Sequence, residues 1–215
     1  MSIQNIIDKA QQIEIDKRRI VGQTISRSQR IKTAERSTAQ PWRFKITPPG
    51  MLPWAASRGF IQVIDFNDRV GEYEISLNNN PGMNYITAYQ GSLTSGQLNS
   101  MTIHAVGTSS FTLTNLPGVS AATVMFQPGD LIQPANSRYP YTVATTSTRG
   151  INTTTSVTLH RPVITSEGIT LQGLQLKVGN SCTWRVVVSA LPTYQLVPMQ
   201  RVQYTGDFEL VEKVI

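Results

Sequence analysis

The sequence predicts a mainly β protein that folds as one large domain with a smaller inserted module. Thr, Ser, Asn and Gln are plentiful and the apolar fraction is 40%, as expected for sheets with one wetted face. From position 42 onward, short alternating apolar runs are separated by Gly, Pro, Asn and Asp, which is typical of strands joined by turns. A chain of 215 residues is long enough to bury a sizeable core.

Positive charge is concentrated near the N-terminus. Residues 1–46 contain ten Lys or Arg and four Asp or Glu, whereas the remainder of the chain contains nine of each. The whole net charge of +6 therefore belongs to residues 1–46, which we call the leader. The high isoelectric point is a property of one segment and not of the whole surface.

The first 20 residues predict an amphipathic helix. Apolar side chains recur mostly at intervals of three or four from Ile3 to about Ile20, and Ser2 stands at the expected cap position. A basic extended arm follows to about position 40, because neither of its alternating sets is apolar enough for a core. A solvated or partly disordered tail is the alternative interpretation.

The bases of this leader are candidate contacts to a partner or a neighbouring subunit: Lys17, Arg18, Arg19, Arg27, Arg30, Lys32 and Arg36. An arm of this kind can pair with an acidic face and add main-chain hydrogen bonds at an edge strand. Nucleic acid is the other class of partner. No aromatic residues alternate with these bases before Trp42 and no recognition motif surrounds them, which favours the protein partner.

The folded body begins at WRFKIT, where Trp42, Phe44 and Ile46 alternate with polar residues and predict a half-buried strand. Three further strand candidates are FIQVIDF, YEISL and YITAY, although ASRGFIQVIDFNDR is also compatible with a short helix. NNNPG predicts a turn between the last two strands. GSLTSGQLNSM predicts a loop or a short helical crossing.

The middle of the chain predicts a compact antiparallel roll or small barrel. Residues 101–164 contain six short strand candidates with turns at NLPG, QPGD, PANS and TRG. The last portion returns to longer strands that we expect to complete the sheet begun at Trp42. The expected organisation is a helix and arm over 1–40, a β domain over 41–100 and 165–215, and the inserted roll over 101–164.

No catalytic, metal or cofactor site is predicted. The only histidines, His104 and His160, are far apart in sequence, and Cys182 is the single cysteine and is expected to be a packed thiol. No nucleophile elbow, phosphate loop or dinucleotide fingerprint is present. Glu72 and Glu74 project from one face of a strand, where a solvated face is a simpler interpretation than an acid/base pair.

The sequence also bears on the compartment and on one alternative function. The N-terminus lacks an apolar signal region and no apolar run is long enough to span a membrane, so synthesis and folding in a reducing cytoplasm are expected. Arg138, Tyr139 and Tyr141 in the roll allow a sugar-binding or hydrolytic accessory as an alternative. Packing is the simpler role for these aromatic residues.

Several stretches resemble the tail-tube and baseplate-hub proteins of contractile-tailed bacteriophages: RSTAQPWRFKITPPG, FQPGDLIQP, YPYTVATTSTRG, VTLHRPVI and QYTGDFELVEKVI. The resemblance spans most of residues 40–215. It implies a tail-tube-like β-barrel or sandwich whose copies stand in a ring, commonly six-fold, around a channel for DNA and the tape-measure protein. It brings no catalytic residues and no cofactor.

This resemblance implies a structural virion protein that is assembled in the host cytoplasm. The extra module over 101–164 favours a tube initiator or adaptor at the junction of tail tube and baseplate, with a plain tube subunit as the alternative. A nucleic-acid-binding head or connector protein that uses the basic arm is a further alternative. Implied partners are further copies, the tube protein, the baseplate hub and the tape-measure protein, with no membrane, and Glu72 and Glu74 become candidates to line the channel.

Overall fold

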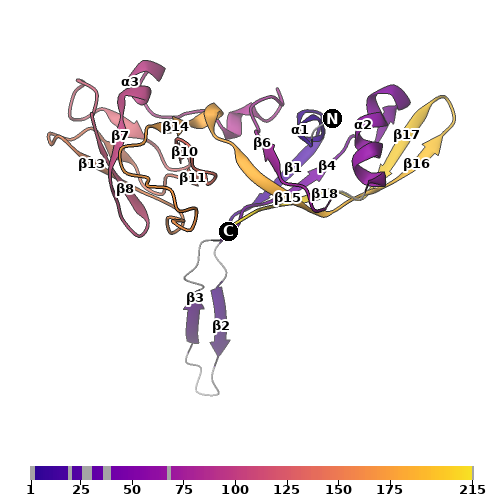
Figure 1. The fold of residues 1–215 in the computed structure, drawn as a ribbon, viewed down its shortest axis with the longest axis horizontal. Coiled ribbons are helices and arrows are strands. Elements are labelled where there is room, and N and C mark those ends of the chain that lie inside the picture. The colour runs from indigo at the N-terminus through magenta and orange to yellow at the C-terminus, as the bar shows by residue number, and fades with distance from the viewer. Residues whose placement is uncertain (1–2, 19–20, 26–30, 36–39, 67–68, 215) are drawn as a thin grey trace.

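The computed structural model describes residues 3–18, 21–25, 31–35, 40–66 and 69–214. These residues form two lobes, one built on a five-stranded sheet and one built from short strands, while a two-stranded hairpin lies apart from both (Figure 1). The prediction of a mainly β fold is confirmed, and every strand pair in it is antiparallel. Within these described ranges no sheet closes on itself and no helix is long and apolar enough to cross a bilayer.

The predicted N-terminal helix is wrong beyond its first turns. Helix α1 spans only Gln4–Asp8, and strand β1 follows at Gln12–Asp16. The period of the apolar residues changes here from three or four to two, because Ile13 and Ile15 alternate with acidic residues. Asn80 then ends the helix, since its side-chain amide donates to the carbonyl of Ile7 at 2.9 Å.

The five-stranded sheet has the order β1-β4-β18-β15-β6. Its other strands are β4 (Arg43–Thr47), β18 (Phe208–Glu212), β15 (Trp184–Ala190) and β6 (Tyr73–Ile75). Phe44 lies opposite Leu210, and Val186 lies opposite Glu212 and Tyr73. The expectation that the last strands complete the sheet begun at Trp42 is therefore confirmed.

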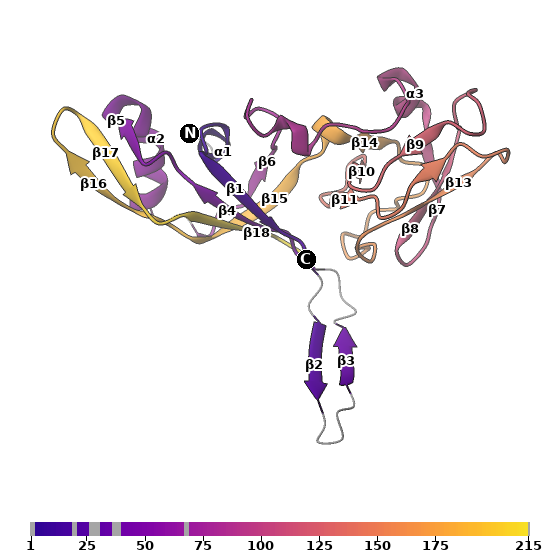
Figure 2. The same ribbon diagram turned by 180° about the vertical axis from the view of Figure 1, so that it is seen from behind.

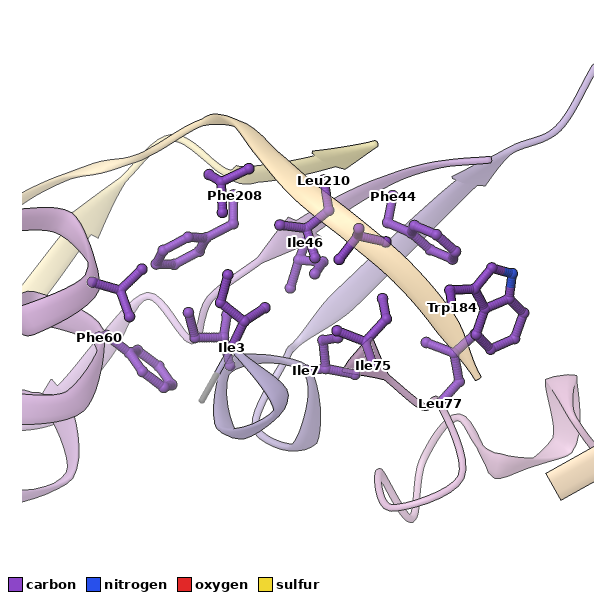
Figure 3. Close-up of a cluster of buried hydrophobic side chains, with 14 of the residues drawn as sticks. Ile3, Ile7, Phe44, Ile46, Phe60, Ile75, Leu77, Trp184, Phe208 and Leu210 are labelled. Carbon is purple, nitrogen blue, oxygen red and sulfur yellow. The ribbon is translucent and has the colours of Figure 1, made fainter. Parts of the chain in front are cut away.

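Two helices cover one face of this sheet (Figure 3). Ile3, just before α1, and Ile7 in α1 point at the sheet, and Phe60 of α2 (Trp54–Asp65) closes one end of the same core. The strand predicted for FIQVIDF is wrong, and the helical alternative holds. Ser57, Phe60 and Ile61 are buried at helical spacing, whereas a strand would have buried every second residue.

The three central strands continue past a bend into a second sheet, of order β16-β17-β5. Its strands are β16 (Thr193–Val197), β17 (Arg201–Thr205) and β5 (Met51–Pro53). The bend follows from the connections, because Pro48 and Pro49 separate β4 from β5 and Pro192 separates β15 from β16. Gly206, at a φ of 93°, makes the corresponding turn between β17 and β18.

The second lobe has its own hydrophobic core, formed by buried residues between Leu93 and Leu176. Its elements are α3 (Ser95–Ser100), β7 (Thr102–Val106), β8 (Ser110–Thr114), β9 (Val124–Phe126), β10 (Leu131–Pro134), β11 (Tyr141–Thr142), β12 (Ser147–Thr148), β13 (Thr155–Thr158) and β14 (Leu176–Val178). They form sheets of order β13-β8-β7, β11-β10-β14 and β12-β9. The strand predicted at YITAY is wrong, because Asn84–Ile86 form a 3₁₀ turn, η1; a second one, η2, spans Gly179–Ser181.

The predicted arm contains a β-hairpin. Strands β2 (Val21–Ile25) and β3 (Ile31–Glu35) pair with each other and lie between β1 and β4 in the chain. Because β1 and β4 are themselves paired, the hairpin prolongs this pair away from the sheet, as both views show (Figure 2). The alternating pattern without apolar character predicted that the arm has an extended backbone. It did not predict that the chain reverses direction and that the two extended segments pair with each other.

Candidate functional site

The face of the five-stranded sheet opposite the helices is open and strongly charged. Along β4, Phe44 and Ile46 are buried, whereas Arg43 and Lys45 are exposed on the other side. A shallow hollow of about 410 Å³ lies on this open face. Its lining residues are Glu14, Asp16, Arg43, Phe44, Lys45, Ser189, Glu209, Leu210 and Val211. A broad charged face of this kind suits water or a polar partner better than a small apolar ligand.

Charges on the open face are matched across the strands. Glu14 lies opposite Lys45 and Asp16 lies opposite Arg43, and opposite charges at such positions stabilise a sheet. The guanidinium of Arg18 donates two hydrogen bonds to the carboxylate of Asp16, at 2.9 and 3.0 Å. These bonds lower the pKa of Asp16 to about 2. The face is therefore rich in charge without a large excess of either sign.

Glu72 and Glu74 lie at the β6 edge of this sheet, and both residues are exposed. The carboxylate of Glu72 forms an ion pair with Lys213 and lies 3.8 Å from Arg138 and 3.9 Å from Arg185. The hydrogen bond from Lys213 and the surrounding bases lower the pKa of Glu72. Glu74 lies opposite Arg185 in the register. Both acids thus lie beside Arg185, and three bases balance the charge of Glu72.

The two bent sheets have four edge strands in the described part of the chain, β1 and β6 in the first sheet and β5 and β16 in the second. Strand β1 pairs only with β4, and β16 pairs only with β17. The sequence of β16, TYQLV, has no charge and no proline, the devices that usually protect an edge. Leu196 on this strand has 66% of its surface exposed. The β16 edge can therefore accept another strand, and the backbone of β1 is likewise unpaired on its outer side.

Apolar side chains gather at the tip of the β16–β17 hairpin. Trp54, Leu196 and Met199 are exposed by 42%, 66% and 90% of their surfaces. Trp54 and Leu196 line a hollow of about 260 Å³ beside the exposed Arg201. An apolar tip of this kind marks a contact surface.

Two of the seven candidate bases of the leader are engaged within the chain. The ammonium of Lys17 donates to Oγ1 of Thr142 at 3.2 Å and lies 4.9 Å from the centre of the Trp42 ring. Arg18 is bound to Asp16. The other five candidates lie outside the residues whose side chains are described: Arg19, Arg27, Arg30, Lys32 and Arg36.

A buried ion pair that the sequence pattern did not predict joins the two lobes. Arg161 and Glu212 have side chains that are only 2% and 0% exposed. Arg161 also donates to the carbonyl oxygens of Gln40 and Pro140 at 2.7 and 2.9 Å. The signal in the sequence was weak, because an Arg after a strand is usually a surface residue.

The side chains in the folded body that could carry chemistry are hydrogen-bonded or buried. Nδ1 of His160 accepts a hydrogen bond from the Thr142 amide at 3.0 Å, and burial raises the pKa of the Cys182 thiol to about 12. Tyr139 and Tyr141 are fully buried, so they offer no stacking platform to a sugar. Among the described residues, no group of three His, Cys, Asp or Glu side chains is placed to hold a metal ion.

No family model matches this chain, and no curated protein matches it.

Proposed function

We propose that this chain is a structural subunit of a phage tail that forms a ring, commonly six-fold, at the junction of tail tube and baseplate. The observation that carries the proposal is the five-stranded sheet, which has one helix-covered face and one open, charge-matched face. A sheet of this kind can wall a water-filled channel, because its core lies on one side only. The open face would look toward the channel and the helices would look outward.

Edge pairing between copies would complete the wall. The edges of β1 and β16 lie at opposite sides of the bent sheet, so a head-to-tail arrangement can join β16 of one copy to β1 of the next. The two strands match in character, because Ile13 and Ile15 of β1 would extend the side of Tyr194 and Leu196. Glu14 would then extend the side that carries Arg201.

The basic hairpin would contact neighbouring subunits or a stacked ring and hold them together. It prolongs β1 and β4 beyond the sheet, which gives it reach past its own lobe. Arg18 is paired with Asp16 within the chain, so these contacts are assigned to the bases farther along residues 1–46. Simultaneous reversal of charge at Arg27, Arg30 and Lys32 is expected to abolish ring assembly.

Glu74 and Glu72 would lie near one rim of the channel wall. Three bases neutralise Glu72, so a mixed and balanced lining fits better than a uniformly negative one. Passing DNA would then meet few strong attachment points, because affinity for DNA grows with unpaired positive charge. The second lobe would stand beside the wall, which favours an initiator or adaptor over a plain tube subunit.

The proposal is tested by crosslinking the two edges. Gln195 and Gln12 are exposed on the same side of their strands as the charged face. A Q12C/Q195C variant is expected to form covalent multimers under mild oxidation, with variants at positions 14 and 16 covering other registers. Cys182 gives little background because it is buried and its thiol has a raised pKa. Negative-stain images of the wild type should show rings.

The matched control is Q12C/Q203C. Gln203 is also exposed, but β17 is paired on both sides and cannot accept a further strand. This variant is expected to stay uncrosslinked. A wild-type chain that remains monomeric at high concentration and beside tube proteins would contradict the proposed function, whereas rings without edge crosslinks would contradict only the edge assignment.

A further inference from the structure

A small pocket lies where the two lobes meet, next to the foot of the hairpin. It has a volume of about 210 Å³. Strands β1, β10 and β11 and the segment before β4 contribute to it, and its lining residues are Ile15, Lys17, Trp42, Ile86, Gly129, Leu131 and Thr142. Most of this wall is aliphatic or aromatic, and Trp42 and Leu131 are buried parts of the main core.

A single cation faces this apolar wall. Lys17 is held in place by its hydrogen bond to Thr142 and by its position over the ring of Trp42. No carboxylate lies within ion-pair distance of its ammonium group among the residues that the structure describes. Partial burial removes water from the charge and lowers the pKa of Lys17. A cation in this position gains free energy when an anion pairs with it.

A second polar group belongs to a residue of the pocket lining, the indole N–H of Trp42. The indole nitrogen of Trp42 is buried and makes no hydrogen bond in the described chain. Trp42 is only 2% exposed, so water reaches this donor poorly. Buried donors usually find an acceptor, so the unsatisfied indole N–H is a second reason to expect a polar ligand at this residue.

We propose that this pocket binds an aliphatic carboxylate. The carboxylate would pair with the ammonium of Lys17, and its short hydrocarbon part would lie against Ile15, Ile86 and Leu131. A multiply charged anion such as phosphate fits less well, because one lysine and an apolar wall cannot compensate its lost hydration. The carboxylate has two possible sources, a free small acid or a Glu or Asp side chain of a second copy.

The experiment titrates sodium butyrate into the ¹⁵N-labelled full chain at neutral pH and constant ionic strength. The indole N–H resonance of Trp42 is the readout, and it is assigned with a Trp42→Phe sample. Butyrate is expected to shift this resonance along a saturating curve. Butyramide has the same shape without the charge and is expected to bind at least tenfold more weakly.

Lys17→Met is expected to weaken butyrate binding at least tenfold, because it keeps most of the side-chain length and removes the charge. Lys9→Met is the matched control, since Lys9 is exposed and lies outside the pocket lining. It should bind butyrate as the wild type does. Unchanged amide spectra outside the pocket show that each variant has folded.

The two sources are separated by dilution without butyrate. If a neighbouring copy supplies the carboxylate, the Trp42 resonance moves with protein concentration, and Lys17→Met removes this movement. If only butyrate moves it, the source is a free acid. The proposal fails if neither butyrate nor self-association shifts the resonance, or if chloride and phosphate shift it as strongly as butyrate does.

Discussion

Arg161 and Glu212 form a fully buried, bidentate ion pair between the lobes. Nη2 of Arg161 lies 2.7 Å from Oε1 of Glu212, and Nη1 lies 2.5 Å from Oε2. Glu212 also accepts from the amide of Trp42 at 3.0 Å, so one carboxylate joins β18, the start of β4 and the second lobe. A buried pair of this kind contributes specificity more surely than stability, because both charges lose their hydration. We infer that it fixes how the lobes are oriented.

Removing one partner of this pair should be severely destabilising. Arg161→Met leaves the carboxylate of Glu212 buried without its counter-charge, and about 3–5 kcal/mol of unfolding free energy should be lost. Urea unfolding followed by tryptophan fluorescence measures the loss.

Two further variants isolate the cause. The double variant R161M/E212Q should lose less than R161M alone, because it leaves no buried charge and still offers an oxygen to the Trp42 amide. Arg138→Met removes a partly exposed partner of Glu72 and should cost less than about 1 kcal/mol. Equal losses in R161M and R138M would show that burial of the pair has no energetic role.

The ion pair of Asp16 and Arg18 should make the stability of the chain depend on pH in the acid range. The pKa of Asp16 is about 2 in the folded chain, below its ordinary value of 3.8. The stabilisation from this carboxylate is therefore complete above about pH 4 and is lost as the pH falls toward 2. An NMR titration of the Asp16 carboxyl carbon should show a midpoint near pH 2.

Arg18→Gln should raise that midpoint toward 3.8, because the strongest cause of the shift is the side-chain hydrogen bond from Arg18. Arg43→Gln is the comparison variant. It should raise the midpoint much less, since Arg43 acts on Asp16 only through the weakest of the contributing charges. A midpoint near 3.8 in the wild type would contradict the described pairing.

The tip of the β16–β17 hairpin holds backbone strain. Met199 and Gln200 have φ values of 67° and 56°, a left-handed conformation that side chains with a Cβ disfavour. Met199→Gly should therefore stabilise the chain by about 0.5–1 kcal/mol, measured by urea unfolding. Gln195→Gly is the control in extended backbone and should destabilise by a similar amount. A loss of stability in Met199→Gly would mean that its exposed side chain has a packing role.

The sequence predicted the strands whose two faces differ most. Trp42, Phe44 and Ile46 alternate with polar residues, and all three are buried on the helix-covered side. FIQVIDF was wrongly predicted as a strand because Phe60, Ile61 and Val63 are compatible with both periods, and only the position of α2 on the sheet decides between them. Tertiary packing, not local pattern, selected the helix.

The acidic residues at the β6 edge of the sheet could be predicted from the sequence. The bases that pair with them could not. Spacing alone placed Glu72 and Glu74 together. It could not supply the bases around Glu72, because they come from the second lobe, from β15 and from the residue after β18. The same limit applies to Lys17, which a charge count assigns to a free arm and the fold places over Trp42.

Asn80 connects the turn after β6 to the end of α1. Its amide donates to the carbonyls of Ile7 and Ala10, and its oxygen accepts from the amide of Gly82. Asn80→Ala should cost about 1–3 kcal/mol, because a buried helix-end carbonyl loses its partner. Hydrogen exchange should show α1 opening first.

Asn79→Ala changes an exposed neighbour and should stay within about 0.5 kcal/mol of the wild type. Equal effects of the two variants would mean that water replaces the side chain at the end of α1, so that packing of Ile3 and Ile7 alone holds this helix on the sheet.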